Sequence, residues 1–569
     1  MAETSRLALS VLKATGLYSD EALARIVAQR EANPGMGLTE ATVKFGGVKE
    51  AEFLQKAGEF LGFDYIDLEK VMPRPDVLQK LPASAVYKYN ALPLRFDGGE
   101  LTVVVSDPFS TVAGDGLRLA ADCPVKTVLA PAEEIDKAIK KFYGVGADAI
   151  EKMIEDGRYA VDDEEGSISK IDVGAEGEEA SIVKFVNRII AEADRQGATD
   201  IHIEPQETEL RIRYRIDGML HKVDVPPQLN RLKSAIISRI KVMANLDIAE
   251  KRLPMDGRIG IRLGGEDIDI RVSTMPTAYG ESISLRLLQK SGSMVKLGDL
   301  GMQPDDQTLI EKLIHRPNGI ILVTGPTGSG KSTSLYAFLH EINRMDVRIL
   351  TAEDPIEYEM PGINQVAVRS DIGLTFARIL RSFLRQDPDI CMVGEIRDAE
   401  TAEIAINASL TGHLVLSTLH TNDSAGAFAR LIDMGVEPFL VASAVSGVLA
   451  QRLIRRLCTH CRREDTLTER QHQLFKLPDI LPPGTTIYEP AGCERCSNTG
   501  YKGRGGIFEL LHVTEAIESM IIARKSSAEI RRKAMEQGMH TLRDDGWRSV
   551  KIGRTTLSEV LRVTEDSED

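Results

Sequence analysis

The segment from Gly319 to Asn343 constrains the fold most strongly, because it reads as a strand, a glycine-rich loop and a helix in succession. Apolar "GIILVT" precedes "GPTGSGKS", and the helix-compatible "TSLYAFLHEIN" follows. The spacing of Gly325, Gly330, Lys331 and Ser332 satisfies a phosphate-binding loop in full. From about residue 297 strand and helix patterns alternate, which predicts a mostly parallel, doubly wound α/β domain around a nucleotide site.

Each residue type in this loop has a chemical reason. Glycines allow a tight turn whose backbone N–H groups face phosphate oxygens, Lys331 reaches the β- and γ-phosphates, and the Ser332 hydroxyl binds Mg²⁺. The alternative, a glycine-rich turn without a ligand, fits poorly between a strand and a helix. The residues expected to hold the nucleotide are Gly325, Pro326, Thr327, Gly328, Ser329, Gly330, Lys331, Ser332 and Thr333.

Acidic residues follow two further apolar strands. "DICMVGEIRD" reaches Glu395, and "ILTAEDPIEYE" continues into Glu353, Asp354 and Glu357. A carboxylate at a strand end beside a phosphate-binding loop is where Mg²⁺ or the attacking water is organised. The alternative is that these acids cap strand ends in solvated loops. Two such strands after one loop favour the catalytic interpretation.

Histidines and arginines supply further candidates. "TGHLVLSTLHTN" places His413 and His420 at the two ends of an apolar strand. A polar group there can sense the γ-phosphate, although a single histidine is more often structural. Hydrolysis also needs positive charge, usually an arginine besides the loop lysine. Candidates are Arg271, Arg286 and, on one predicted helical face, Arg378, Arg381 and Arg385, with surface ion pairing as the alternative for all five.

The chain of 569 residues is too long for one core and predicts several domains. Residues 1–145 read as an α/β module with a hairpin turn at Asp97-Gly98-Gly99. Residues 146–178 are acidic and poor in large apolar side chains, which indicates a flexible linker. Residues 179–292 mix a helix with strands and predict an α+β domain. Residues 297–569 hold the nucleotide domain and end in small helices.

The composition argues against several classes of protein. A net charge of −15 provides no basic field for nucleic acid or anionic lipid. The chain has no uninterrupted apolar run of about 18 residues, so no membrane span is expected. The N-terminal residues lack the pattern of a signal peptide. We therefore expect a cytoplasmic protein that does not bind nucleic acid.

Four of the six cysteines form two C-x-x-C pairs, Cys458 with Cys461 and Cys493 with Cys496. In a large cytosolic protein such pairs more often hold a metal than a disulfide, and four thiolates suit a closed, structural Zn²⁺ site. Redox-active or merely reduced thiols are the alternative. The five arginines of "QRLIRRLCTHCRRE" are expected on a solvated face, with a partner surface as the other interpretation.

Together these motifs resemble the secretion and pilus ATPases of the PilT/GspE superfamily, and most closely its type IV pilus assembly (extension) ATPases. "GPTGSGKST", "ILTAEDPIEYE", "RQDPDICMVGEIRD" and "TGHLVLSTLHTN" look like the Walker A, Asp, Walker B and His boxes. "ATDIHIEP", "RYRIDGML" and "DIAEKRLPMDGRI" are similar to the adjoining N-terminal domain. The resemblance covers residues from about 180 to 510.

The resemblance implies a RecA-like ATPase domain, a preceding PAS-like α+β domain (N2), a zinc subdomain at 452–505, a separate N-terminal module and a ring hexamer. It implies that Glu395 is the Walker B glutamate and that Glu357 helps to position the attacking water. Which of the two is the base is left open. His420, with His413, would lie near the γ-phosphate, and Arg271 and Arg286 would close over the nucleotide.

The first 145 residues resemble the N-terminal module of pilus extension ATPases (MshEN or N1-like), some of which bind cyclic di-GMP. Here Ala8 stands where those binders carry a glycine, Gly16 lies one place late, and Arg30 replaces a glutamine. These departures count against cyclic di-GMP, so a docking module is favoured.

The implied function is a cytoplasmic, hexameric, Mg²⁺-dependent ATPase that drives pilus extension through an inner-membrane platform protein (PilC-like), with which it associates peripherally. The type II secretion ATPase is the near alternative, because the two share every catalytic motif. The long N-terminal module and "TAEDPIE" favour the pilus motor. A nucleic-acid translocase and a non-hydrolysing scaffold are remote alternatives.

Overall fold

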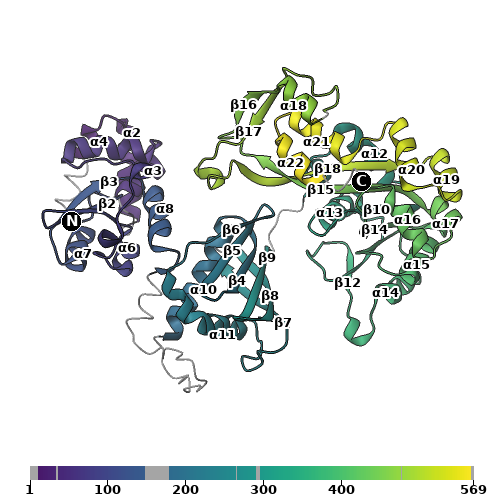
Figure 1. The fold of residues 1–569 in the computed structure, drawn as a ribbon, viewed down its shortest axis with the longest axis horizontal. Coiled ribbons are helices and arrows are strands. Elements are labelled where there is room, and N and C mark those ends of the chain that lie inside the picture. Colours follow the sequence, from purple (N-terminus) through teal and green to yellow (C-terminus); the bar gives the residue numbers. More distant parts are fainter. Residues whose placement is uncertain are drawn as a thin grey trace. The chain divides into compact units, whose positions relative to one another are not determined.

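The computed structural model of the chain has the strand, loop and helix that the phosphate-binding motif predicts, as β10 (Gly319–Thr324) and α13 (Lys331–Ile342) (Figure 1). The structure describes residues 10–33, 36, 38–147, 178–263, 266–289, 295–475 and 477–564. The chain divides into two compact units, Met1–Gln289 and Lys290–Asp569. The predicted acidic linker lies outside the described residues, apart from its first two residues and its last.

The second unit is built on a seven-stranded sheet with the order β12-β11-β13-β14-β10-β15-β18. All neighbours are parallel except β15 and β18, which are antiparallel. The predicted parallel, doubly wound sheet is therefore confirmed. Besides β10, its strands are β11 (Ile349–Glu353), β12 (Asn364–Ala367), β13 (Ile390–Val393), β14 (Leu414–Leu419), β15 (Val445–Leu457) and β18 (Tyr501–His512).

Both faces of this sheet are covered by helices, which explains why its central strands read as continuous apolar runs. In β10, Ile320 and Leu322 enter one core with α14 and α15, whereas Ile321 and Val323 enter a second core with α12 and α13. The helices and 3₁₀ turns here are η3 (Leu297–Asp299), α12 (Pro304–Ile314), η4 (Ser370–Ile372), α14 (Phe376–Phe383), α15 (Ala399–Leu410), α16 (Gly426–Asp433) and α17 (Pro438–Ala444).

The cysteine region and the C-terminal helices share a smaller core. Leu467, Leu481 and Ile487 pack with Trp547 and Val560. A short antiparallel pair, β16 with β17, connects the two cysteine pairs. The elements of this part are β16 (Arg463–Thr466), α18 (Glu469–Leu474), β17 (Thr486–Glu489), η5 (Glu494–Cys496), α19 (Glu515–Ile522), α20 (Ser527–Glu536), α21 (Leu542–Lys551) and α22 (Leu557–Thr564).

The first unit contains the α+β domain predicted before the nucleotide domain. Its sheet has six antiparallel strands in the order β6-β5-β4-β9-β8-β7. Apolar side chains such as Ile203 and Ile270 pack on one face with Phe185 and Ile236 of the helices, so the alternate, charged side chains occupy the other face. Its elements are α10 (Glu178–Arg195), β4 (Ala198–Pro205), β5 (Leu210–Ile216), β6 (Met219–Lys222), η2 (Pro227–Leu232), α11 (Lys233–Met243), β7 (Met255–Leu263), β8 (Glu266–Thr277) and β9 (Gly280–Gln289).

The N-terminal module is α/β, as predicted, with its own core. Asp97 pairs with Glu100 across a turn whose two residues, Gly98 and Gly99, have φ of 60° and 87°, values that favour glycine. Strand β3 pairs parallel with β2. The elements are α2 (Asp20–Ala32), α3 (Leu38–Gly46), α4 (Glu50–Leu61), η1 (Leu68–Lys70), α5 (Pro75–Leu78), α6 (Ala83–Tyr89), β1 (Leu92–Asp97), β2 (Glu100–Val105), α7 (Thr111–Ala121), β3 (Val125–Leu129) and α8 (Ala132–Tyr143).

Among the helices that the structure describes, none combines the length and the apolar composition needed to cross a lipid bilayer.

Candidate nucleotide-binding site

The glycine-rich loop leaves β10 and is shaped by close contact with β15. Gly325 has φ of 147°, and a Cβ there would lie 2.5 Å from the carbonyl oxygen of Gln451. Gly330 has φ of 89°, and a Cβ there would lie 2.8 Å from the side-chain nitrogen, Nε2, of the same glutamine. Ser334 Oγ donates to Gln451 Oε1 at 2.7 Å and fixes that side chain. Both glycines are therefore required by backbone conformation and by space.

Helix α13 starts directly after the loop, with Gly330 as its N-cap and no side chain capping its first turn. The first N–H groups of a helix carry a partial positive charge and bind phosphate oxygens. Ser332 lies in this turn and is exposed, where its hydroxyl can reach a metal ion. Ser329 is 3% exposed, and its Oγ has no hydrogen-bond partner among the described residues. The loop thus has the donors of a phosphate site.

Lys331 holds its ammonium group over the loop. Its Nζ donates to the carbonyl oxygens of Gly325 at 2.9 Å and Pro326 at 3.1 Å. Burial lowers the pKa of Lys331, the negative charge of Glu395 opposes this, and the positive charge of Arg452 adds to the lowering. An anion against the loop would favour the charged form of this lysine.

Glu395, His420 and Arg397 meet at the edge where β13 and β14 end. The Glu395 carboxylate accepts from Arg397 and lies 3.3 Å from His420 Nε2, and its side chain is 15% exposed. Burial alone would raise the pKa of Glu395, but the hydrogen bonds from Arg397 and His420 hold it below its ordinary value. The structure therefore brings together Lys331, Glu395 and His420, and adds Arg397, which the sequence motifs did not single out.

Glu353, at the end of β11, is 4% exposed, and its carboxylate is held by hydrogen bonds. It accepts hydrogen bonds from the hydroxyl of Tyr336, from Thr351 Oγ1 at 2.6 Å and from Gln365 Nε2 at 3.0 Å. The Tyr336 hydroxyl in turn accepts from the backbone N–H of Glu357 at 3.2 Å. Tyr336 thus links α13 to the Glu353 carboxylate and to the backbone of Glu357. It was missed in the sequence because it looks like an ordinary buried residue of an apolar helix.

Asp354 follows Glu353 and is exposed. The hydrogen bond to Glu395 raises the pKa of Arg397, and the negative charge of Asp354 adds to this effect. The acidic strand ends of β11 and β13 are therefore electrostatically connected through Arg397.

His413 does not reach this edge. It precedes β14, whose first residue pairs with Gly319 at the start of β10, whereas the loop follows the end of β10. The six residues of β14 lie between His413 and His420, so seven strand spacings, roughly 23 Å, separate the two histidines. His413 Nδ1 lies 2.9 Å from the Ala408 carbonyl oxygen. The expectation that His413 lies near the γ-phosphate bound by its own chain is corrected, because parallel strands separate the two ends of the sheet.

Arg271 and Arg286 belong to the first unit. They stand directly opposite each other on β8 and β9, on the charged face of the six-stranded sheet.

Of the three arginines predicted on one helical face, Arg378 and Arg381 lie on α14, but that helix ends at Phe383. Arg385 therefore lies beyond the helix and not on one helical face with the other two.

The five arginines around the first cysteine pair do not share one solvated face. Arg452 is 8% exposed and lies beside the loop, and a Cβ on Gly325 would be 3.2 Å from its NH1. Its NH2 donates to the carbonyl oxygen of Asn422, two residues after His420, at 3.0 Å. Arg455 pairs with the buried Glu559, whereas Arg456 is exposed. The expectation of a solvated face is wrong for Arg452, whose apolar neighbours along buried β15 were the available signal.

The four cysteines converge as predicted from their spacing. Their sulfur atoms all lie within 4.8 Å of one another. Cys458 and Cys493 are 3.7 Å apart, and Cys461 and Cys496 are 3.8 Å apart. A disulfide would need about 2 Å, whereas four thiolates bound to a tetrahedral Zn²⁺ at 2.3 Å lie about 3.8 Å apart. The donor set and its spacing therefore fit a Zn²⁺ ion.

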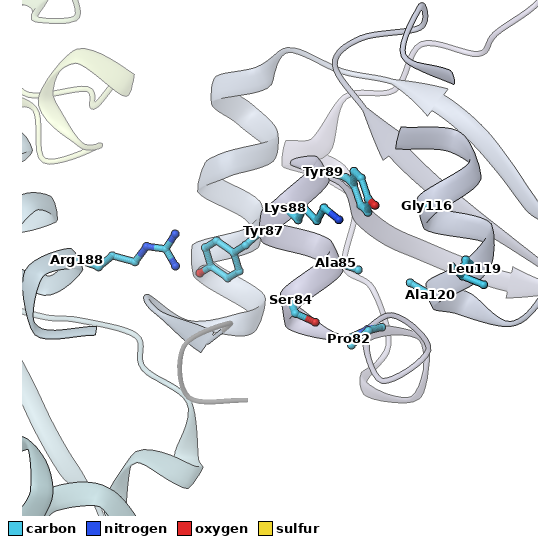
Figure 2. A pocket seen from close by; sticks show the side chains of 10 residues that line it. All are labelled: Pro82, Ser84, Ala85, Tyr87, Lys88, Tyr89, Gly116, Leu119, Ala120 and Arg188. Atoms are coloured by element: carbon cyan, nitrogen blue, oxygen red, sulfur yellow. The ribbon is translucent and has the colours of Figure 1, made fainter. Parts of the chain in front are cut away.

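A separate hollow of about 570 Å³ lies in the first unit, between α6, α7 and Arg188 of α10 (Figure 2). The Arg188 guanidinium stacks 4.8 Å from the ring centre of Tyr87. Among the described residues, no carboxylate lines the hollow. The lining residues are Pro82, Ser84, Ala85, Tyr87, Lys88, Tyr89, Gly116, Leu119, Ala120 and Arg188.

Comparison with known proteins matches most of the chain to one family. The family model "Type II/IV secretion system protein" matches residues 175–562, and the MshEN domain model matches residues 61–149. The chain is 41% identical to the type IV pilus assembly ATPase PilB of Myxococcus xanthus, over 96% of this chain and 97% of that protein. It is also 41% identical to the type II secretion system protein E of Xanthomonas campestris, over 95% of each chain.

Among solved structures, the pilus retraction motor PilT with bound ADP is similar, with 26% identity and a TM-score of 0.44, covering 66% of this chain and 95% of that one.

Proposed function

The chain belongs to the family of type II/IV secretion system proteins and is an ATPase, and from this premise we propose that it drives type IV pilus assembly (extension). The observation that supports ATP-driven work most directly is the meeting of Lys331, Glu395 and His420 at one edge of the parallel sheet. A phosphate-binding loop, an ionised carboxylate and a polar group at the end of the neighbouring strand are the parts that phosphoryl transfer to water requires.

The proposed roles follow from this geometry. The backbone of the loop from Gly325 to Thr333 and the ammonium group of Lys331 hold the phosphates. The hydroxyl of Ser332 would hold Mg²⁺, which neutralises phosphate charge. Glu395, kept ionised by Arg397 and His420, or Glu357 positions and deprotonates the attacking water. Glu353 and Asp354 complete the acidic edge.

Arg271 and Arg286 are proposed to supply the positive charge that the transferring phosphoryl group needs. They lie on a different domain from the loop, so their approach would couple the γ-phosphate to domain closure. We propose that six copies form a ring in which this closure is converted into mechanical work.

The proposed partner is an inner-membrane platform protein of the pilus machine, with which the motor associates from the cytoplasm. The N-terminal module is proposed to dock to the machine rather than to bind cyclic di-GMP, because of the departures at Ala8, Gly16 and Arg30. Cys458, Cys461, Cys493 and Cys496 are proposed to hold one structural Zn²⁺ that fixes the ends of β15 and β18.

The second candidate function is the type II secretion ATPase, since a relative of that kind is as similar as the pilus relative. The preference for pilus extension rests on the long N-terminal module and on "TAEDPIE".

A single genetic experiment separates the two. A deletion strain is complemented with wild type or with Glu395→Gln, and surface fibres and secreted proteins are measured in the same cultures. Fibres that return only with wild type, while secretion is intact throughout, support the pilus motor. Normal fibres with exoproteins retained in the periplasm would make this chain the secretion ATPase.

A further inference from the structure

The charged face of the six-stranded sheet carries a row of residues that stand directly opposite one another on five strands. Arg258 of β7 pairs with Arg271 of β8, and Arg271 pairs with Arg286 of β9. Arg286 pairs with Asp200 of β4, and Asp200 with Arg215 of β5. Directly paired residues on adjacent strands share one face of a sheet, so all five project to the same side.

Three consecutive members of this row are arginines. Like charges directly opposite each other destabilise a sheet, and here two such pairs lie side by side. Asp256 and Asp269 flank the row two residues along β7 and β8, whereas each arginine stands directly opposite another arginine. A local rule broken in this way is expected at a functional site, where an anion compensates the charge.

Asp200 fixes one end of the row. Its side chain is 9% exposed, and it accepts from Arg286 Nε at 2.9 Å and from Thr199 Oγ1 at 2.8 Å. Arg215 Nε lies 3.9 Å from Asp200 Oδ2, the oxygen that accepts from Thr199. The Arg286 side chain remains 59% exposed while it is held through Nε. Asp200 therefore orients Arg286 without covering it, which is what a positioning residue does.

We propose that Arg258 is a third phosphate-binding arginine beside Arg271 and Arg286, and that Asp200 is the positioning residue for this row. The ligand is the phosphate chain of a nucleoside triphosphate, so the inference rests on the proposed function. Two strand spacings place the three arginines along about 10 Å, which suits several phosphate groups in succession. Guanidinium groups bind phosphate through paired hydrogen bonds, which a lysine cannot reproduce.

The test measures nucleotide binding by the assembled full-length protein in a Glu395→Gln background, so that ATP is not consumed. We expect Arg258→Gln to weaken ATP binding about tenfold and ADP binding much less, because one charge-assisted phosphate contact is lost. Arg258→Lys should recover only part of the affinity. The matched control is Lys222→Gln, which removes one positive charge from β6 where Lys222 is paired with Glu209, and it should leave binding unchanged.

A second measurement separates this role from a structural one. Arg258→Gln should not lower the melting temperature, because it removes a like-charged neighbour of Arg271. If Arg258 instead stabilised the sheet, the same substitution would lower the melting temperature. Asp200→Asn should reduce the preference for ATP over ADP in the same direction as Arg258→Gln.

Failure of the inference and failure of the proposed function give different results. Tight ATP binding that is equal in Arg258→Gln and Lys222→Gln would overturn the phosphate role of Arg258 and leave the ATPase standing. Loss of binding to vesicles with acidic lipids, without any loss of ATP affinity, would overturn it in favour of a membrane role for the row. Absence of ATP hydrolysis by wild type would instead overturn the proposed function.

Discussion

The two large sheets of this protein gather functional side chains in different ways. In the parallel sheet, Lys331, Glu395 and His420 come from segments that follow three different strands, and they meet because all those strands end at one edge. In the antiparallel sheet, Arg258, Arg271 and Arg286 come from the middle of three strands, and they meet only because of the register. The difference teaches that the parallel sheet forms its site from residues at the ends of strands, whereas the antiparallel sheet gathers residues that are paired across the middle of adjacent strands.

The largest effect is expected at the edge site. Glu395→Gln should lower the rate of ATP hydrolysis by about 100-fold or more, because the group that activates water is lost, while ATP binding is retained. Phosphate release and equilibrium binding of labelled ATP check this. If the rate falls less than tenfold, Glu357 would be the base, and the group that activates water would follow β11 rather than β13.

The cysteine cluster is an intermediate case, because each C-x-x-C pair is local in sequence but the pairs meet through β15 and β18. Cys496→Ser should abolish stoichiometric Zn²⁺ and lower the free energy of unfolding by several kcal/mol, roughly as loss of a structural metal does. Metal analysis and denaturant unfolding test this. Cys123→Ser, which changes a cysteine of the N-terminal module, should leave the zinc content intact.

Arg452 tests whether the edge site extends to β15. Arg452→Gln should weaken nucleotide binding about tenfold, because the guanidinium lies beside Gly325, donates to Asn422 and contributes positive charge there. The matched control is Arg456→Gln on the same strand, where the side chain is exposed. Equal affinities in the two variants would confine the site to the ends of the other parallel strands.

The smallest effect concerns pH and the antiparallel row. Burial alone would raise the pKa of Asp200, but the hydrogen bonds from Arg286 and Thr199 hold it below its ordinary value. A carboxylate with a lowered pKa stabilises the folded state above its unfolded pKa, about 3.8, and this contribution is lost as the pH falls further. Asp200→Asn should therefore cost about 1–3 kcal/mol, unchanged from pH 8 to 5 and shrinking below about pH 4.

Denaturant unfolding of both proteins across this pH range checks the prediction. A difference that changes as the pH falls below about 6.5 would show that a histidine dominates instead, such as His202 on the same strand, whose pKa is lowered by burial.

The contrast between the sheets also explains what the sequence could predict. The phosphate loop and the acidic strand ends are contiguous patterns that parallel topology puts together, so the nucleotide fold and most of its edge were predictable. Each cysteine pair is also a contiguous pattern, and its C-x-x-C spacing predicted the metal site. His413 was misplaced because one apolar strand has two ends and the motif does not say which faces the loop. Arg452 and Tyr336 were missed because their partners come from distant strands, and the Arg258 row depends on register, which single strands do not encode.

Strand β15 connects the phosphate-binding loop to the cysteine cluster. Gln451 near its middle sets the shape of the phosphate loop through Gly325 and Gly330, and Cys458 follows its end. Seven strand spacings, about 23 Å, thus separate Gln451 from Cys458, and β15 pairs with β18 along this stretch with one register shift between Arg455 and Leu457. One strand therefore carries the residue that shapes the glycine-rich loop and leads directly into the first cysteine pair, so we expect a displacement of the cysteine subdomain to change the shape of the loop.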